Sequence, residues 1–154
     1  MDGFYKTTFK KSNDDTWTTP KDFYDKLNAE FNFSLDAAAL KSSNLCENWF
    51  GPDHDNPELR DALAIDWLQF APSKTVWLNP PYGRTIKDWM HKANQEATDN
   101  QLTVVCLVPA RTDTKWWHSY CIVHEVRFIK GRLRFGNQKN DAPFPSAVVV
   151  MKSG

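Results

Sequence analysis

The spacing of apolar residues predicts several helices along the 154-residue chain. Residues 20–30 carry apolar side chains at four-residue intervals, which predicts a helix with one apolar face. Thr19 is placed to cap this helix, and Pro20 would be its first residue. The same spacing predicts a helix that begins near Asn56 and another over residues 84–98, and residues 112–120 are a candidate for a short helix.

Short apolar runs predict the strands. They lie at residues 33–39, 75–78, 102–108, 125–129 and 147–151, with residues 48–50 as a further short candidate. Strands that alternate with helices favour an α/β fold with a parallel or mostly parallel sheet covered on both faces. The last two strands have no clear helix between them, which indicates an antiparallel pair at one end of the sheet. We expect a flexible arm over residues 1–16 and a single domain over residues 17–154.

The sharpest motif, Asn79-Pro80-Pro81-Tyr82, directly follows the buried strand at 75–78. Ligands of open α/β sheets gather beyond the carboxyl ends of the strands. The Asn79 side-chain oxygen and the Pro80 carbonyl can accept hydrogen bonds from a planar NH2 group, which frees the nitrogen lone pair for attack. Proline has no N–H and stiffens the loop, and Tyr82 is placed to stack on a base. The alternative is that these four residues form only a rigid turn.

Acidic residues near two other predicted elements are candidates for a cofactor site. Asp36 ends the first strand and is followed by Ala37 and two further alanines, whose small side chains let a ligand approach the backbone. Its carboxylate would bind an amino group, or else it marks the start of a helix. Asp66, next to Trp67, would accept a hydrogen bond from an adenine amine, or else lies on the surface of an amphipathic helix.

Composition changes this picture in three respects. Net charge is zero, so overall charge does not hold the chain on nucleic acid, but residues 111–139 are locally basic. That segment is either a binding face or an ordinary solvated surface. Cys46, Cys106 and Cys121 have no C-x-x-C spacing, which favours buried free thiols over structural zinc. No metal, signal segment or membrane span is expected.

Several motifs follow one another in order from about Trp17 to Met151. They occupy residues 17–20, 33–39, 61–67, 76–83, 107–114, 116–117, 130–135 and 142–146. Together they resemble the phage-encoded DNA N6-adenine methyltransferases of Dam type. The resemblance implies a Rossmann-like methyltransferase fold, with a mostly parallel seven-stranded sheet that contains one antiparallel strand. It also implies S-adenosylmethionine as the cofactor and adenine N6 in DNA as the methyl acceptor.

The resemblance also suggests roles for individual residues. The catalytic loop would be Asn79, Pro80, Pro81 and Tyr82, and the cofactor contacts would be Thr19, Pro20, Asp36, Ala37 and Asp66. Arg111, Thr112 and Asp113 would line the base pocket or the DNA face. With the basic segment, the expected DNA contacts are Arg111, Thr112, Lys115, Arg132 and Arg134. Asn79 stands where many adenine-specific enzymes have Asp; both side chains accept the required hydrogen bond.

The expected partner is double-stranded DNA, in the cytoplasm of a bacterial host. No separate target-recognition domain is visible in the sequence, so the loop over 132–145 or a second subunit, as in a homodimer, would read the DNA. Cytosine N4, an RNA base and a protein Gln amide are alternative methyl acceptors, because the same acceptor geometry serves them all. A non-catalytic binding module with this fold is a further alternative. A dinucleotide oxidoreductase is disfavoured, since no G-x-G-x-x-G follows the first strand.

Overall fold

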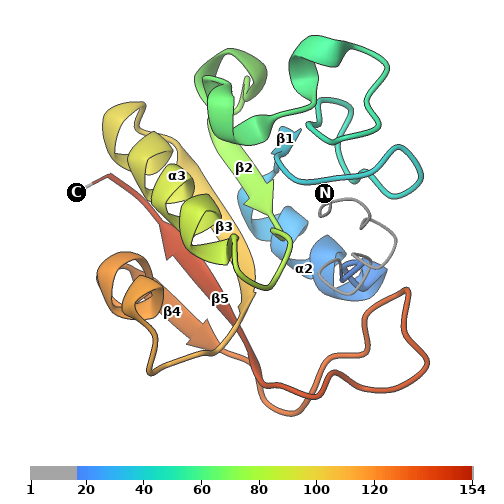
Figure 1. Ribbon diagram of the computed structural model, residues 1–154, viewed down its shortest axis with the longest axis vertical. Helices are drawn as coiled ribbons and strands as arrows, with labels where there is room; N and C mark the ends of the chain where they lie inside the picture. The colour runs from blue at the N-terminus through green and yellow to red at the C-terminus, as the bar shows by residue number, and fades with distance from the viewer. Residues whose placement is uncertain (1–16, 154) are drawn as a thin grey trace.

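The computed structural model describes residues 17–153, so the arm expected over residues 1–16 lies outside the described part. It shows an α/β fold, as the alternation of elements predicts (Figure 1). Five strands form one sheet in the order β1-β2-β3-β5-β4. Their bounds are β1 (Leu35–Asp36), β2 (Thr75–Leu78), β3 (Thr103–Pro109), β4 (Glu125–Phe128) and β5 (Ser146–Met151).

The sheet is mixed. β1 and β3 pair with β2 in parallel, whereas β5 is antiparallel to both of its neighbours, β3 and β4. The antiparallel pairing of the last two strands is therefore confirmed. The expectation of seven strands in a mostly parallel sheet is wrong for residues 17–153, which form five strands with half of the pairings antiparallel. The direct physical reason is that the 38 residues between β1 and β2 form loops and short turns instead of another strand–helix unit.

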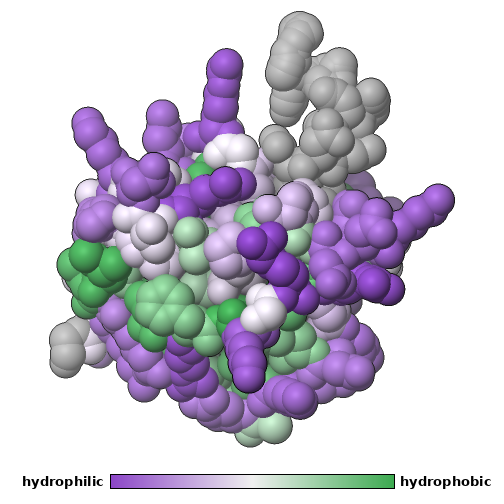
Figure 2. All heavy atoms as spheres, turned by 90° about the horizontal axis from the view of Figure 1, so that it is seen from below, coloured by the Kyte–Doolittle hydropathy of each residue, from purple (hydrophilic) through white to green (hydrophobic). Residues whose placement is uncertain are grey.

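The carboxyl ends of β1, β2 and β3 meet at one edge of the sheet, since these strands are parallel. Ser146 pairs with Pro109 and Ala147 with Phe128, so the loop that joins β4 to β5 also begins and ends at this edge. Figure 2 looks onto the side of the molecule toward which β2 points, where apolar areas interrupt a largely hydrophilic surface. We call this edge of the sheet, where β1, β2 and β3 end and the β4–β5 loop begins and ends, the carboxyl edge.

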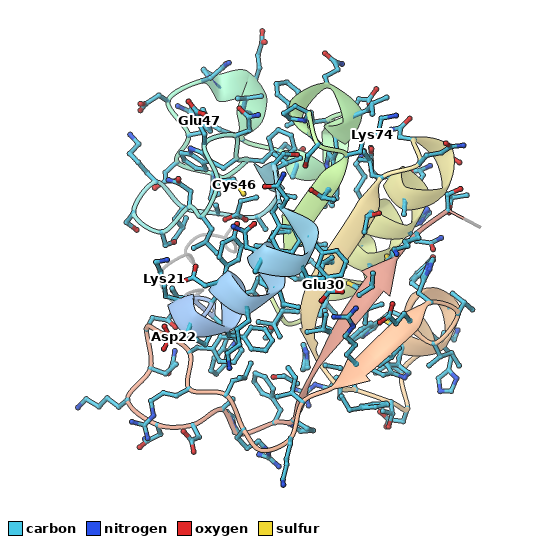
Figure 3. The ribbon with its side chains drawn as sticks, turned by 180° about the vertical axis from the view of Figure 1, so that it is seen from behind. Lys21, Asp22, Glu30, Cys46, Glu47 and Lys74 are labelled. Atoms are coloured by element: carbon cyan, nitrogen blue, oxygen red, sulfur yellow. The ribbon has the colours of Figure 1, made fainter. Side chains whose placement is uncertain are left out.

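Helices α2 (Lys21–Phe31) and α3 (Ile86–Asp99) cover opposite faces of the sheet (Figures 1 and 3). α2 buries Tyr24 against Trp77 of β2, and Asn32, in a left-handed conformation, ends the helix. The predicted cap is wrong in detail, because Pro20 occupies the N-cap position and no side chain caps the helix. Thr19 is thereby left available for a different contact.

Helix α3 forms where the sequence predicts it, because its apolar positions repeat at helical spacing. Ile86, Met90, Ala93 and Ala97 are each at most 5% exposed and face β3 and β5. The candidate helix at 112–120 becomes a π-helical turn, η5 (Trp117–Cys121). All three cysteines are buried free thiols, as expected.

The helix expected from Asn56 breaks into three 3-10 turns, η2 (Pro57–Leu59), η3 (Ala62–Ala64) and η4 (Trp67–Phe70). Asn56, Asp61 and Asp66 each cap one turn by accepting a hydrogen bond from the backbone N–H two residues later. Such side chains compete with the backbone for its donors, so a new turn begins every five residues and no continuous helix forms.

Candidate active site

A cleft of about 180 Å³ opens where β1 and β2 end at the carboxyl edge. This volume suits an organic ligand rather than one or two waters. Asp36 is in register with Trp77, so the residues just beyond both strands lie side by side. The cleft is lined by residues 17–19, 36–40, 50–52, 60–62 and 79–81, together with Ser43, Leu45, Trp77 and Trp89. It thus brings together the motif after β2 and the acidic end of β1.

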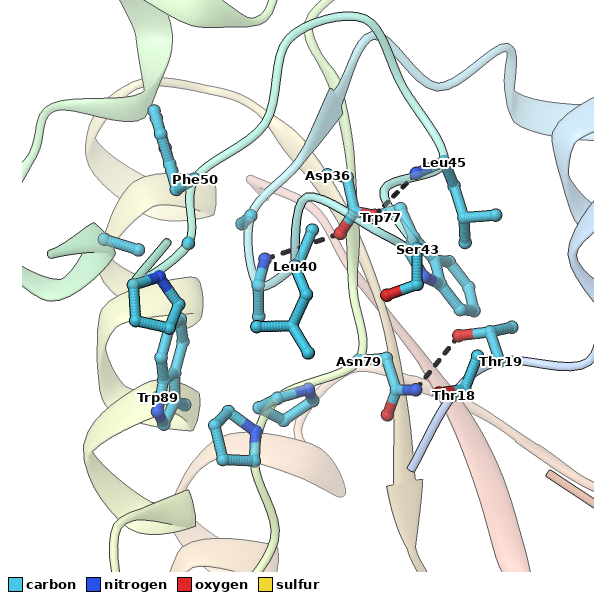
Figure 4. A pocket seen from close by; sticks show the side chains of 18 of the residues that line it. Thr18, Thr19, Asp36, Leu40, Ser43, Leu45, Phe50, Trp77, Asn79 and Trp89 are labelled. Atoms are coloured by element: carbon cyan, nitrogen blue, oxygen red, sulfur yellow. Dashed lines mark hydrogen bonds between the residues drawn. The ribbon is translucent and has the colours of Figure 1, made fainter. Parts of the chain in front are cut away.

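The Asn79 side chain is held by hydrogen bonds from its amide nitrogen. Nδ2 donates to the Trp17 carbonyl and to Thr19 Oγ1, the latter at 3.0 Å (Figure 4). The Asn79 Oδ1 atom is buried and accepts no hydrogen bond from any described residue. A buried acceptor without a partner costs about 1–3 kcal/mol and in native proteins calls for an explanation. A donor group on a ligand would supply the missing partner.

The remaining residues of the motif divide between the cleft and the core. Pro80 and Pro81 line the cleft, and no described residue donates a hydrogen bond to the Pro80 carbonyl. Tyr82 does not line the cleft. It is 5% exposed and donates its hydroxyl to the Leu107 carbonyl at 3.0 Å. Burial, and to a smaller extent the neighbouring Cys106 thiol, raises the pKa of its phenol. Its ring stacks on Trp17.

Asp36 is only 2% exposed at the wall of the cleft. Its Oδ2 accepts from the Leu45 N–H at 3.0 Å and its Oδ1 from the Ala38 N–H at 3.4 Å. Burial raises the pKa of this carboxyl to about 7, although the two backbone donors oppose the rise. Among residues 17–153 no cation pairs with it. A cationic ligand group would therefore stabilise its charged form.

The wall beside Asp36 consists of small residues and backbone. Ala37 and Ala39 are buried, and the Ala39 N–H donates to the Phe50 carbonyl at 2.8 Å. Residues 48–50 run alongside 36–39, since Asp36 and Trp49 form an isolated parallel bridge. The predicted short strand at 48–50 is thus reduced to this bridge. Gly51 lies against Ala39, where a Cβ would clash with the backbone.

The structure does not bring Asp66 to the cleft. Its Oδ1 caps η4 and accepts from Asn100 Nδ2 at 3.0 Å. Asp61, five residues earlier, lines the cleft instead, with Arg60 and Ala62. Thr19 and Ala37 also line the cleft, but Pro20 does not. The sequence does not show which of these short turns faces the cleft, so it could not point to Asp61 rather than Asp66.

The basic residues expected to contact DNA lie in two places. Arg111 sits over the Phe144 ring, 5.6 Å from its centroid, and Arg132 and Arg134 belong to the β4–β5 loop at the carboxyl edge. Arg134 pairs with Asp141 and both are well exposed. Lys115 instead borders a second groove, between α3 and η5, with Lys87 and Lys92. Thr112, whose carbonyl contacts His118, is exposed beyond β3.

Besides Asp61, sequence reasoning missed Trp89 and the backbone of Trp17. Trp89 falls on the apolar spacing of α3, a pattern that gives no sign of a ligand contact, although its side chain lines the cleft. The hydrogen bond to the Trp17 carbonyl leaves no signal in the sequence, because every residue has a backbone carbonyl. Within residues 17–153, no three His, Cys, Asp or Glu side chains lie close enough to hold a metal ion. The described helices include none that is long and apolar enough to cross a bilayer.

Comparison with known proteins identifies the family of the chain. Residues 6–152 match the sequence profile of the family described as DNA N-6-adenine-methyltransferase (Dam). The chain belongs to this family. The match covers almost the whole sequence, and it confirms the resemblance that the ordered motifs indicate.

Two curated phage proteins of the same description are similar to the chain. The DNA N-6-adenine-methyltransferase of Haemophilus phage HP1 is 29% identical over 139 residues, which cover 87% of this chain and 73% of that protein. The DNA N-6-adenine-methyltransferase of Escherichia phage T1 is 30% identical over 104 residues, which cover 67% of this chain and 39% of that protein. The Dam-family assignment thus rests on the profile match over residues 6–152, and these two partial similarities agree with it.

Proposed function

We propose that this Dam-family chain methylates the N6 amino group of adenine in DNA, with S-adenosylmethionine as the methyl donor. The observation that carries the proposal is the unpartnered, buried Asn79 Oδ1 beside a ligand-sized cleft. The catalytic motif alone suits any planar amine. Family membership supports adenine N6 as the acceptor.

Asn79 and Pro80 would act on the acceptor amine. The lone pair of an aromatic NH2 is delocalised into the ring, which makes the nitrogen a poor nucleophile. Hydrogen bonds from its two N–H groups to Asn79 Oδ1 and the Pro80 carbonyl favour a tetrahedral nitrogen and localise the lone pair. Both acceptors are free of other partners among the described residues.

The residues around Asp36 fit the methyl donor. The donor has a cationic amino group, a planar adenine and a sulfonium that supplies an activated methyl group. No described residue pairs a cation with the buried Asp36 carboxylate, and the small residues 37–39 leave space beside it. Asp61 also lines the cleft and has one carboxylate oxygen free of its capping bond, which suits an amine of the adenine ring. Trp89 supplies an apolar wall.

DNA would bind across the carboxyl edge. The target base has to leave the helix stack, at a cost of roughly a few kcal/mol, before its amine can reach Asn79. Contacts from Arg111, Arg132 and Arg134 to phosphates would offset part of that cost. The β4–β5 loop that carries two of these residues is the candidate for reading the sequence. A homodimer that contributes a second loop remains a prediction, as does action in the bacterial cytoplasm.

Transfer of a labelled methyl group to unmodified DNA tests the proposal directly. We expect label in DNA, and nucleoside analysis should place it on N6-methyladenine. Label on N4-methylcytosine, in RNA or in protein would contradict the acceptor assignment. Asn79→Ala should abolish transfer and leave donor binding near the wild-type level. Lys152→Ala is the matched control, because Lys152 follows β5 at the opposite edge of the sheet. This variant should transfer the methyl group at the wild-type rate.

A further inference from the structure

We propose that the segment 17–19 fixes the orientation of the Asn79 amide, and that this contact requires Asn rather than Asp at position 79. The inference rests on the proposed function, because it takes Asn79 Oδ1 as the acceptor of the target amine. It assigns Thr19 and the Trp17 backbone a positioning role, distinct from contact with the methyl donor.

The orientation follows from the chemistry of the two partners. A backbone carbonyl can only accept a hydrogen bond, so the Trp17 oxygen must face the amide nitrogen of Asn79 and never its oxygen. Thr19 Oγ1 accepts the second N–H at 3.0 Å. Both amide hydrogens are then used, and Oδ1 is turned away from the segment, as Figure 4 shows. A rotated amide would place two oxygens against each other at Trp17.

The segment that holds Asn79 is itself held by the β4–β5 loop. The Trp17 ring packs edge-on against Phe135 and Phe144 of the β4–β5 loop, with centroids 5.4 and 5.1 Å away. Thr18 donates its N–H to Asn137 Oδ1 and accepts from the Gly136 N–H at 2.8 Å. These contacts keep the Trp17 carbonyl in place, so Asn79 meets a rigid acceptor rather than a mobile loop.

An ionised carboxylate at position 79 could not make the hydrogen bond to the Trp17 carbonyl. It has no hydrogen to donate, so one of its oxygens would face the Trp17 carbonyl oxygen without a hydrogen bond. A protonated carboxyl, in contrast, donates to the carbonyl through its O–H and keeps its other oxygen as the acceptor. Burial and this hydrogen bond both favour the neutral form and raise the pKa of such a group. Asn supplies the neutral donor-and-acceptor pair at every pH.

The decisive experiment compares the pH profile of kcat in Asn79→Asp with that of the wild type, at saturating donor and DNA. We expect the ratio of variant to wild-type kcat to rise as pH falls from 8 to 5, by up to tenfold per unit where the new carboxyl is mostly ionised. A ratio that stays constant with pH would overturn the proposal, whether the variant is fully active or inactive. Circular dichroism and donor binding confirm that the variant is folded.

Thr19 variants test the hydrogen bond from the Asn79 amide to Thr19 Oγ1. Thr19→Val keeps the shape and removes the hydroxyl, so we expect kcat to fall about tenfold with donor affinity within twofold of wild type. Thr19→Ser should restore kcat. A parallel loss of donor affinity would show that Thr19 serves the donor and would overturn its positioning role. If the wild type transfers no methyl group, or Asn79→Ala remains active, the proposed function fails instead.

Discussion

Gly51 packs so tightly against Ala39 that a Cβ on residue 51 would lie 1.9 Å from the Ala39 carbonyl oxygen. The contact joins the two loops that form one wall of the cleft, beside the hydrogen bond from the Ala39 N–H to the Phe50 carbonyl. Backbone atoms meet on both sides, so no side-chain rotation relieves the clash. Glycine at this position is therefore required by close approach rather than by an unusual backbone conformation.

Gly51→Ala should separate these loops and damage the cleft. We expect the free energy of unfolding to fall by roughly 1–3 kcal/mol, the usual cost of overpacking, and donor affinity to fall at least tenfold. Denaturant unfolding and calorimetric titration of the donor measure the two effects. Gly131→Ala is the control for adding a methyl group, because nothing lies within 4 Å of a Cβ there. Its positive φ of 79° gives it a modest stability cost, but donor affinity should not change. Wild-type donor affinity in Gly51→Ala would contradict the argument.

Donor binding should depend on pH through Asp36. The pKa of its carboxyl is raised to about 7, so the carboxyl is neutral below and charged above that value. If the charged form binds the donor's cationic amino group, donor affinity falls as pH drops from 7 toward 5, by up to tenfold per unit. Calorimetry at several pH values measures this slope.

The same raised pKa makes the free energy of unfolding depend on pH when no donor is bound. The pKa of the Asp36 carboxyl is raised from the ordinary aspartate value of 3.8, so the folded state holds the proton more tightly than the unfolded state. The stability that this proton provides is complete below pH 4 and is lost as pH rises toward 7. Asp36→Asn should flatten both pH dependences and bind the donor weakly at every pH. A donor affinity that is equal at pH 5.5 and 7.5 in the wild type would refute the assignment.

Asp61 and Asp66 form a matched pair for testing the adenine end of the donor. Each caps a 3-10 turn by accepting a backbone N–H at 3.2 Å, so alanine at either should cost a similar amount of stability, about 0.5–2 kcal/mol. Only Asp61 lines the cleft. We expect Asp61→Ala to weaken donor binding about tenfold and Asp66→Ala to change it less than twofold. The reverse result would restore Asp66 as the contact.

Phosphate contacts from the β4–β5 loop should appear in the salt dependence of DNA binding. Arg132→Ala and Arg134→Ala should each weaken binding and lower the slope of log K against log salt by about one unit. Lys152→Ala should leave the slope unchanged, because Lys152 lies at the opposite edge of the sheet. Lys115→Ala shows whether DNA also reaches the groove between α3 and η5. An unchanged slope in both arginine variants would remove the loop from the DNA interface.

The catalytic motif and the strand before it could be predicted from the sequence because their signals are local. The apolar run at 75–78 coincides with β2, and the apolar spacing of residues 84–98 gives α3 within two residues. Residues 56–70 were harder to predict, since their apolar spacing favours a helix while Asn56, Asp61 and Asp66 each restart a turn. Side-chain competition for backbone donors overrides periodicity there.

Local patterns in the sequence were enough to predict the α/β class and the Asn79-Pro80-Pro81-Tyr82 loop after a buried strand. They also contain an ordered set of motifs specific enough to indicate the family. Which of these residues meet became clear only from the folded chain. It turned Thr19 from a helix cap into a partner of Asn79, placed Asp61 rather than Asp66 at the cleft, and buried Tyr82 behind it. Each outcome depends on contacts between segments up to about 60 residues apart, and on backbone atoms such as the Trp17 carbonyl. Backbone groups are common to all residues, so no pattern of side chains could reveal them.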